Sequence, residues 1–199
     1  MCGRFGLESN IYELLERYRF LEKGTSIKSE SEVFYPSDKV TVIIGNKLHK
    51  LSWGIKTSEN SKLIINSRIE NIINKKYFCE DFKSRRCIIP ANYFFEWDKI
   101  KIGNSKYKIY DINNDIFSFA GIYRRVVDNK NNYEFISLLT RESEGEIAKI
   151  HKRMPIIIPK NYEKDYLIEG NFDVVIRNIM KFRPNLDLKL VSDSQLSFI

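Results

Sequence analysis

The chain has 199 residues with a formal net charge of +7, and 43% of its residues are hydrophobic and 13% aromatic. This length and composition are typical of one globular domain with a real core and exclude a disordered chain. No segment approaches 18 consecutive apolar residues, and Glu8, Glu13 and Glu16 stand where a signal peptide would be apolar. We therefore expect a single domain over residues 1–199, cytoplasmic, monomeric and without a membrane-spanning segment.

Cysteine usage argues against two further classes. Cys2, Cys79 and Cys87 are an odd number and contain no CxxC pair, which disfavours both a disulfide framework and a zinc site. We expect no metal and no cofactor. The positive charge suits a polyanion such as nucleic acid, although the general richness in Lys, Ile and Asn weakens that inference. Arginine placement is more informative, because a guanidinium can fork onto phosphate.

Hydrophobic periodicity predicts a mostly β chain with a few helices. Asn10 and Glu13 resemble a helix capping pair, and Gly45-Asn46 is typical of a tight hairpin turn. The expected helices lie near residues 10–22, 72–82, 144–150, 161–168 and 172–180. The expected strands cover residues 40–44, 48–53, 63–65, 85–90, 93–97, 107–111, 116–127, 133–140, 156–158 and 186–191. The four strands between residues 93 and 140 should form an antiparallel meander, with turns at 103–104, 113–114 and 128–132. The predicted class is α+β, mainly antiparallel β with peripheral helices.

The first five residues, Met1-Cys2-Gly3-Arg4-Phe5, carry the most distinctive chemistry. Removal of Met1, usual before a small residue, would leave Cys2 with an α-amine and a thiol on adjacent carbons. The reference pKa values of these groups are about 8 and about 8.5, so both are reactive near neutral pH. Such a pair can act as a thiolate nucleophile or condense with an aldehyde. The alternative is that Cys2 is an incidental second residue.

Two titratable residues stand in unusual surroundings. Glu96 lies between Phe95 and Trp97, so it is either a partly buried carboxylate suited to proton transfer or a strand-edge group facing solvent. His151 is one of two histidines and follows a predicted helix directly before a strand. Such a junction is a common place for a site, although a lone histidine is more often structural.

Asn66 and Arg68 lie two positions apart at a predicted strand end. They would project to the same face and place an amide beside a guanidinium. That pair could anchor a phosphate or a carbonyl, and an ordinary loop cap is an equally common explanation.

The order of these segments resembles one known family. The matching boxes are Met1 to Phe5, Asn66-Ser67-Arg68-Ile69-Glu70, Arg86 to Ala91 continuing to Phe94-Phe95-Glu96-Trp97, Phe119-Ala120-Gly121, and Ile150 to Pro155. They are similar to the boxes of the SOS-response-associated peptidase (SRAP) domain, the family of abasic-site-processing proteins. The resemblance covers residues 2 to about 192, and it implies curved, barrel-like sheets.

The resemblance also implies a function in the DNA damage response, namely detection of abasic sites in single-stranded DNA and covalent capture of the sugar aldehyde. The Cys2 amine would form an imine and the Cys2 thiol would close a thiazolidine. Asn66 would orient the sugar or the amine, Glu96 would move protons, and His151 would act at the ring oxygen. The same imine permits elimination of the 3′ phosphate, which is a lyase activity.

For DNA contacts, the resemblance suggests Arg4, Arg68 and Arg153, with Arg85 and Arg86 as further candidates. The family often has Trp-Gly-Leu-x-Pro-x-Trp after the first hairpin, whereas this chain reads Trp53-Gly54-Ile55-Lys56-Thr57-Ser58 and lacks the proline and the second tryptophan. Trp53 is therefore the expected base-stacking residue. Ser67 and Tyr93 replace a common alanine and a common glycine.

Two other classes share some of these features. An N-terminal-nucleophile glutamine amidotransferase also begins Met-Cys-Gly, but this chain continues Arg4-Phe5 and has no Asn-Gly dipeptide. A non-covalent single-stranded nucleic-acid-binding module would show the same charge and aromatic content. A peptidase activity of Cys2, directed at a peptide bond or only at its own Met1, is a third alternative.

Overall fold

The computed structural model describes residues 2–22, 30–56, 63–74, 76–98, 105–128, 131–168, 170 and 172–191. Met1, the Thr57-Ser58 segment, and the turns expected at 103–104 and within 128–132 lie wholly or partly outside the described residues. No helix among the described residues is long and apolar enough to cross a membrane.

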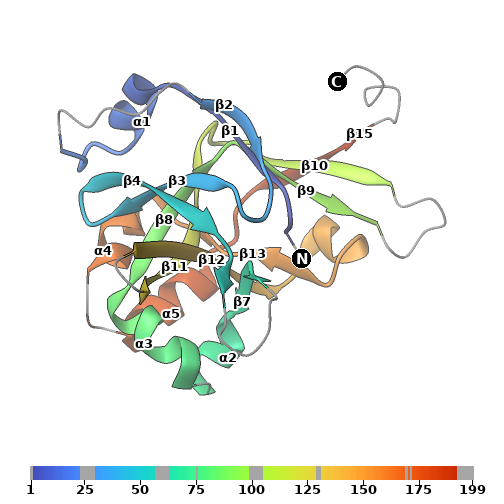
Figure 1. The fold of residues 1–199 in the computed structure, drawn as a ribbon. Coiled ribbons are helices and arrows are strands. Elements are labelled where there is room, and N and C mark those ends of the chain that lie inside the picture. Colours follow the sequence, from blue (N-terminus) through green and yellow to red (C-terminus); the bar gives the residue numbers. More distant parts are fainter. Residues whose placement is uncertain are drawn as a thin grey trace.

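The described elements alternate between short strands and a few helices (Figure 1). The helices are α1 (Ile11–Arg17), α2 (Ile69–Asn74), α3 (Lys76–Ser84), α4 (Glu163–Leu167) and α5 (Phe172–Lys181), with 3₁₀ turns η1 (Gly145–Lys149) and η2 (Lys160–Tyr162). The first strands are β1 (Phe5–Ser9), β2 (Glu30–Phe34), β3 (Lys39–Ile44), β4 (Lys47–Trp53), β5 (Ile55–Lys56), β6 (Leu63–Ile64), β7 (Asn66–Arg68) and β8 (Arg86–Ala91). The remaining strands are β9 (Tyr93–Trp97), β10 (Lys106–Asp111), β11 (Phe117–Asp128), β12 (Asn131–Glu142), β13 (Arg153–Pro155), β14 (Ile157–Ile158) and β15 (Leu186–Val191).

The larger sheet closes on itself. Strands β12, β4, β3, β8 and β11 pair in that order, and β11 pairs again with β12, which completes a barrel. Closure removes the exposed strand edges of these five strands. β7 and β13 add to β12, and β14 adds to β11. The predicted α+β class with barrel-like sheets and peripheral helices is confirmed.

The smaller sheet has the order β15-β10-β9-β1-β2. β9 and β10 pair in this sheet, whereas β11 and β12 pair in the barrel. The expected single meander from residue 93 to 140 is therefore wrong, because the chain changes sheets between Asp111 and Phe117. Hydrogen bonds from Asn113 N–H and Asn114 Nδ2 to the Asp111 carboxylate, at 2.9 and 3.2 Å, turn the chain at this point.

An aromatic cluster joins the two sheets. The ring of Phe5 on β1 contacts Trp53 on β4 and Phe119 on β11, with centroid distances of 5.0 and 5.7 Å. Phe94 on β9 also contacts Phe119 at 5.7 Å. All four side chains are fully buried. Phe5 therefore anchors strand β1, and with it the start of the chain, in the core between the two sheets.

Helix α1 is capped as expected and ends early. Asn10 Oδ1 accepts a hydrogen bond from Glu13 N–H, and Glu13 accepts one from Asn10 N–H, which is a capping box. The chain leaves helical geometry at Tyr18 instead of residue 22, because the Tyr18 ring turns into the core and its hydroxyl lies 2.9 Å from Ser118 Oγ.

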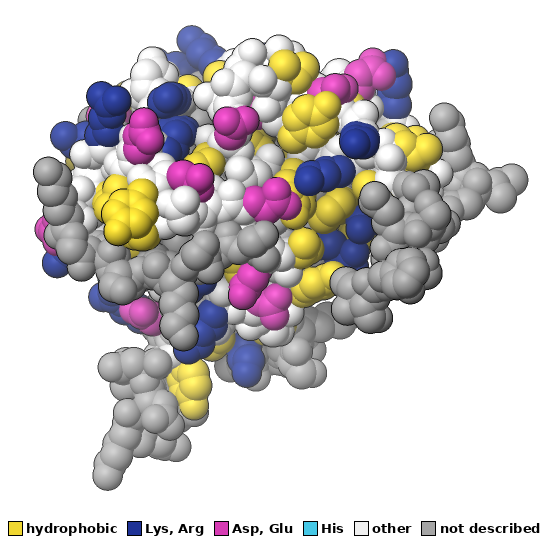
Figure 2. All heavy atoms as spheres, turned by 90° about the horizontal axis from the view of Figure 1, so that it is seen from above, with side chains coloured by type: hydrophobic (Ala, Val, Ile, Leu, Met, Phe, Trp, Pro, Cys, Tyr) yellow, Lys and Arg dark blue, Asp and Glu magenta, His cyan; other side chains and the backbone are white. Residues whose placement is uncertain are grey.

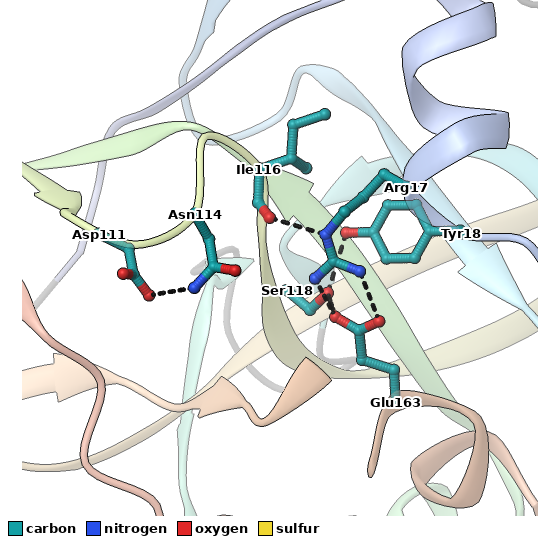
Figure 3. A network of polar contacts seen from close by, with 7 residues as sticks. All are labelled: Arg17, Tyr18, Asp111, Asn114, Ile116, Ser118 and Glu163. Carbon is teal, nitrogen blue, oxygen red and sulfur yellow. Dashed lines mark hydrogen bonds and ion pairs between the residues drawn. The ribbon is translucent and has the colours of Figure 1, made fainter. Parts of the chain in front are cut away.

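A buried ion pair holds α1 and α4 against β11 (Figure 3). The Arg17 guanidinium donates to both oxygens of Glu163, at 2.8 and 2.5 Å, and its Nε donates to the carbonyl of Ile116 at 3.0 Å. Ser118 Oγ donates to the same carboxylate at 2.5 Å. These hydrogen bonds satisfy a carboxylate that would otherwise be costly to bury.

The chain between residues 144 and 158 also differs from the simple helix and strand expected there. The helix is a 3₁₀ turn that begins at Gly145, whose φ of 57° lies in the left-handed region. The strand is divided at Ile156, whose N–H donates to Leu139 and whose carbonyl accepts from Ala120. Ile156 thus bridges β12 and β11 directly.

Candidate functional site

Pairing of β1 with β9 positions the start of the chain. Phe5 pairs with Phe94, and the Phe95 N–H donates to the carbonyl of Arg4 at 2.9 Å. The antiparallel register carries Cys2 and Gly3 toward the end of β9 that bears Glu96. In Figure 1 this segment runs down toward β7 and β13.

Asn66 fixes Cys2 from the barrel side. Its Nδ2 donates a 2.8 Å hydrogen bond to the backbone carbonyl of Cys2. β7 is anchored in turn by parallel pairing with β12 and by a 2.9 Å contact between the hydroxyls of Ser67 and Ser137. Asn66 Oδ1 is buried and has no hydrogen-bond partner among the described residues, so it offers an acceptor to a donor on the N-terminal group or on a substrate.

The Cys2 thiol differs from the thiol, reactive near neutral pH, that the reference pKa values suggested. Cys2 is fully buried, and its Sγ lies 3.6 Å from the carbonyl oxygen of Arg4. Burial, and next the negative charge of Glu96, raise the pKa of the thiol well above its ordinary value. The thiol is therefore protonated at neutral pH, and its conversion to a nucleophile requires a proton acceptor.

Glu96 is the buried carboxylate of the two alternatives left open by the sequence. It is 2% exposed and shares a buried strand side with Phe94. Its Oε1 lies 3.9 Å from His151 Nδ1, and its charge acts on the Cys2 thiol. Both residues come from distant parts of the sequence, so the fold itself assembles the pair.

His151 is held by the backbone of Arg153 in a way that suits two protonation states. The Arg153 N–H lies 3.0 Å from Nδ1 and the Arg153 carbonyl oxygen lies 2.8 Å from the same atom. Neutral Nδ1 can accept from the N–H, and protonated Nδ1 can donate to the carbonyl. The ring can therefore gain or lose a proton at Nδ1 without moving.

The side chain of Arg153 is occupied by protein partners. Its two terminal nitrogens donate to the two oxygens of Glu70 at 2.8 and 2.9 Å, and one also donates to the carbonyl of Thr140 at 2.6 Å. A phosphate would have to displace Glu70 to bind Arg153. Glu70 is the last residue of the Asn-Ser-Arg-Ile-Glu box, and no role was predicted for it from the sequence. Its place in that box was the one sequence feature that could have indicated a role.

Arg86 does not fit a role in DNA binding. It is 4% exposed, and its guanidinium donates to carbonyls of the chain, namely those of Tyr166, Phe82, Lys83, Ile168 and Gly170. Prediction of a phosphate contact at Arg86 is corrected accordingly: the residue joins the end of α3 to the end of α4. Its neighbour Arg85 is part-exposed and pairs with Asp81 at 2.7 Å.

Trp53 is also corrected, from base-stacking residue to core residue. The indole is fully buried, and its N–H donates to the carbonyl of Ile65 at 3.0 Å. No face of the ring is available to a base, because Phe5 packs against it.

Arg4 and Arg68 are the candidate arginines that keep an available guanidinium. Arg68 is exposed at the end of β7. The Arg4 guanidinium has no hydrogen-bond or ion-pair partner among the described residues, and its Nε is buried. Its guanidinium instead lies over the rings of Tyr35 and Trp97, 4.5 and 5.1 Å from their centroids.

The described part of the chain contains no cluster of three or more His, Cys, Asp or Glu side chains that could hold a metal ion. The groups that the fold gathers around Cys2 are instead an amide, a carboxylate and an imidazole. Together they can orient a terminal residue and move protons at it.

Comparison with known proteins identifies the class. The family model of the SOS response associated peptidase (SRAP) matches residues 1–193, and the chain therefore belongs to the SRAP family. It is 32% identical over 188 residues to the abasic site processing protein YoaM of Bacillus subtilis, which covers 86% of this chain and 81% of that protein. It is 31% identical over 187 residues to the abasic site processing protein YoqW of the same organism, covering 87% and 83%.

The fold has a solved counterpart. A crystal structure of a protein from Bacteroides thetaiotaomicron superposes with a TM-score of 0.86 at 22% identity, covering 98% of this chain and 94% of that one. At this level of identity the likeness concerns the fold alone, and it agrees with the barrel and the flanking sheet described above.

Proposed function

We propose that this SRAP protein recognises abasic sites in single-stranded DNA and captures them covalently through Cys2. The observation that carries the proposal is that Asn66 holds the backbone of Cys2 at 2.8 Å while the charge of Glu96 acts on the Cys2 thiol. His151 lies 3.9 Å from Glu96. The names of the YoaM and YoqW relatives agree with processing of abasic sites.

In this proposal the amine acts before the thiol. An abasic deoxyribose is partly an open-chain aldehyde, and the Cys2 amine, present once Met1 is removed, attacks its C1′. Loss of water gives an imine. The thiol, which is protonated because burial and Glu96 raise its pKa, then adds to the imine carbon while its proton passes to the imine nitrogen. The product is a thiazolidine, and one water is released in total.

Glu96 and His151 supply the proton transfers. Glu96 takes a proton from the amine or thiol and returns it to the nitrogen. His151 gives a proton to the ring oxygen of the sugar during ring opening. The Arg153 backbone can hydrogen-bond the imidazole in either of its protonation states. Elimination of the 3′ phosphate from the same imine would give a lyase side activity. Removal of Met1 by the chain itself would be the peptidase activity.

The test is incubation of the protein with single-stranded DNA that carries one abasic site, followed by denaturing electrophoresis. A covalent band should form, should disappear for Cys2→Ala and should persist for Cys79→Ala. Cys2→Ala and Cys2→Ser both keep the terminal amine and should give a band only after borohydride reduction of the imine. Without borohydride, a band of equal yield with Cys2→Ala, in protein of verified N-terminus, would contradict the proposal.

Two measurements separate the remaining alternatives. Release of ammonia from glutamine would favour the amidotransferase. Salt-sensitive retention of DNA with no covalent band, using protein that mass spectrometry shows to begin at Cys2, would favour a non-covalent binding module.

A further inference from the structure

Tyr35 is presented on a rigid and strained turn. Residues Tyr35 to Asp38 form a β-turn closed by the Asp38 N–H donating to the Tyr35 carbonyl at 3.1 Å, and Ser37 has a φ of 85°. Proline at the second position and positive φ at the third are typical of a type II turn. Positive φ is unusual for serine and costs energy, so the surrounding structure must hold this conformation.

Two hydrogen bonds hold the turn against the barrel, and two more lie within the turn. Ser37 N–H donates to the carbonyl of Trp53 and Trp53 N–H donates to the carbonyl of Asp38, both at 2.8 Å. The Asp38 carboxylate accepts from the Tyr35 N–H at 2.7 Å, in addition to the bond that closes the turn. The backbone of Tyr35 is therefore fixed while its side chain remains 44% exposed.

One side of the Tyr35 ring is already covered by a cation. The Arg4 guanidinium stacks on it at 4.5 Å and reaches the half-buried Trp97 ring at 5.1 Å. Arg4 is two residues from Cys2, so this stack stands at the Cys2 site. A guanidinium between two rings keeps its N–H edges for an anion, and Arg4 uses none of them within the described residues.

Two aromatic residues of β9 are closed to a base. The Phe95 and Tyr93 rings are nearly buried and are covered by Lys106 and Lys108, whose Nζ atoms lie 4.0 and 3.5 Å from the two centroids. On the face shown in Figure 2, basic side chains are mixed with acidic and hydrophobic ones and form no continuous basic patch. On that face the positive charge is therefore dispersed.

We propose that Tyr35 is a DNA-binding residue, which stacks on the base next to the captured nucleotide while Arg4 binds the adjoining phosphate. The inference rests on the proposed function for the identity of the DNA lesion. It gives the stacking role, which Trp53 cannot perform, to a residue on a different element. The occupant is a nucleotide because the site combines an exposed aromatic ring with a guanidinium that has no hydrogen-bond partner in the described part of the chain. Single-stranded nucleic-acid sites combine the same two features.

The decisive measurement uses DNA that cannot react. Single-stranded DNA with a tetrahydrofuran abasic analogue and a fluorescent 2-aminopurine at the neighbouring position reports binding by anisotropy and stacking by quenching. Tyr35→Ala should weaken binding about 5- to 150-fold and abolish the quenching. Tyr35→Phe should retain both, because stacking needs the ring and not the hydroxyl.

Tyr133→Ala is the matched control. Tyr133 is 45% exposed, almost as much as Tyr35, and lies at the far end of β12 from the site. Its substitution should change neither binding nor quenching. Wild-type affinity and quenching in a folded Tyr35→Ala variant, or equal loss in Tyr133→Ala, would overturn the inference.

The outcome is separable from that of the proposed function. If wild-type protein quenches 2-aminopurine in a Tyr35-dependent way but forms no covalent band with aldehydic DNA, the stacking role stands and covalent capture fails. If the covalent band forms and Tyr35→Ala has no effect on affinity or quenching, the stacking role fails alone.

Discussion

Asn66 and Cys2 lie 64 positions apart in the sequence, and a 2.8 Å hydrogen bond from Asn66 Nδ2 to the Cys2 carbonyl joins them. This bond attaches the reactive end of the chain to the barrel. Since the adjoining segment of β1 is held by β9, Cys2 is fixed from two sides. The terminal amine is thereby oriented before a substrate arrives, which lowers the entropic cost of reaction.

Loss of the Asn66 amide should therefore slow adduct formation. Asn66→Ala removes the bond, and Asn66→Asp places a carboxylate against a carbonyl oxygen. A truncated buried hydrogen bond costs about 1–3 kcal/mol, which corresponds to a rate reduction of about 5- to 150-fold. Single-turnover gel assays at saturating DNA measure the rate. Unchanged rates in both variants would exclude a positioning role, and Asn10→Ala, which removes only the α1 cap, controls for general destabilisation.

Glu96→Gln should change thiol titration and adduct formation in opposite directions. Burial and the Glu96 charge raise the pKa of Cys2, so neutralising residue 96 lowers that pKa and shifts the midpoint of alkylation to lower pH. Adduct formation should nevertheless slow, because the proton acceptor is lost. Mass spectrometry of alkylated peptides reads each cysteine separately.

Cys87 is an internal control for this experiment. It is buried like Cys2, and its pKa is raised by burial alone, so its alkylation profile should not move. A Cys2 midpoint that stays in place, or one that shifts together with that of Cys87, would show that Glu96 does not act on the Cys2 thiol.

Arg86 substitutions should affect stability and leave intrinsic DNA affinity unchanged. Arg86→Ala leaves the carbonyls of Tyr166, Phe82 and their neighbours without donors and should cost about 3–5 kcal/mol. Arg86→Lys restores one charged donor and should cost less. Urea unfolding measures the loss, and DNA affinity is measured on the folded fraction of Arg86→Lys. Weaker DNA affinity of fully folded Arg86→Lys would indicate that Arg86 does bind a DNA phosphate.

Local features of this fold were predictable from sequence. The capping box of Asn10 and Glu13 and the hairpin turn at Gly45 depend on residues a few positions apart. The change of sheet after Asp111 depends on which strands pair with β9 and β11, and those strands are distant in sequence. A local sequence pattern therefore does not predict it. The two corrected DNA contacts have the same origin, because distant residues occupy both side chains. The carbonyls of Tyr166, Ile168 and Gly170 accept from Arg86, and the ring of Phe5 packs against Trp53.

Stability should fall at alkaline pH through buried phenols and thiols. Burial raises the pKa of Tyr18, Tyr166 and Cys87 in the folded state. Above the unfolded values, about 8.5 for Cys and 10 for Tyr, the unfolded chain releases protons that the folded chain retains. The stabilisation is fully present below those unfolded pKa values. Above them, each group lowers the free energy of unfolding by about 1.4 kcal/mol per pH unit.

Tyr18→Phe tests this linkage at one residue. At pH 7 the variant should lose about 1 kcal/mol, because the hydrogen bond with Ser118 is removed. Above about pH 10, the reference pKa of tyrosine, the difference in free energy of unfolding between wild type and variant should narrow and then reverse. The reason is that the phenylalanine ring has no hydroxyl proton to release. Urea unfolding from neutral to alkaline pH gives both curves. Parallel curves would show that Tyr18 ionises alike in the folded and unfolded states.

Ser37→Gly should stabilise the turn that carries Tyr35. Glycine adopts the φ of 85° seen at Ser37 without strain, and relief of about 1–3 kcal/mol outweighs its greater entropy loss of about 0.5–1 kcal/mol. A net gain near 1 kcal/mol raises the melting temperature by about 2–4 °C for a chain of this size. Ser37→Val should lower it, because a β-branched residue at positive φ is a steric outlier. Scanning calorimetry measures both, and an equal shift for the two variants would mean that Ser37 is unstrained in solution.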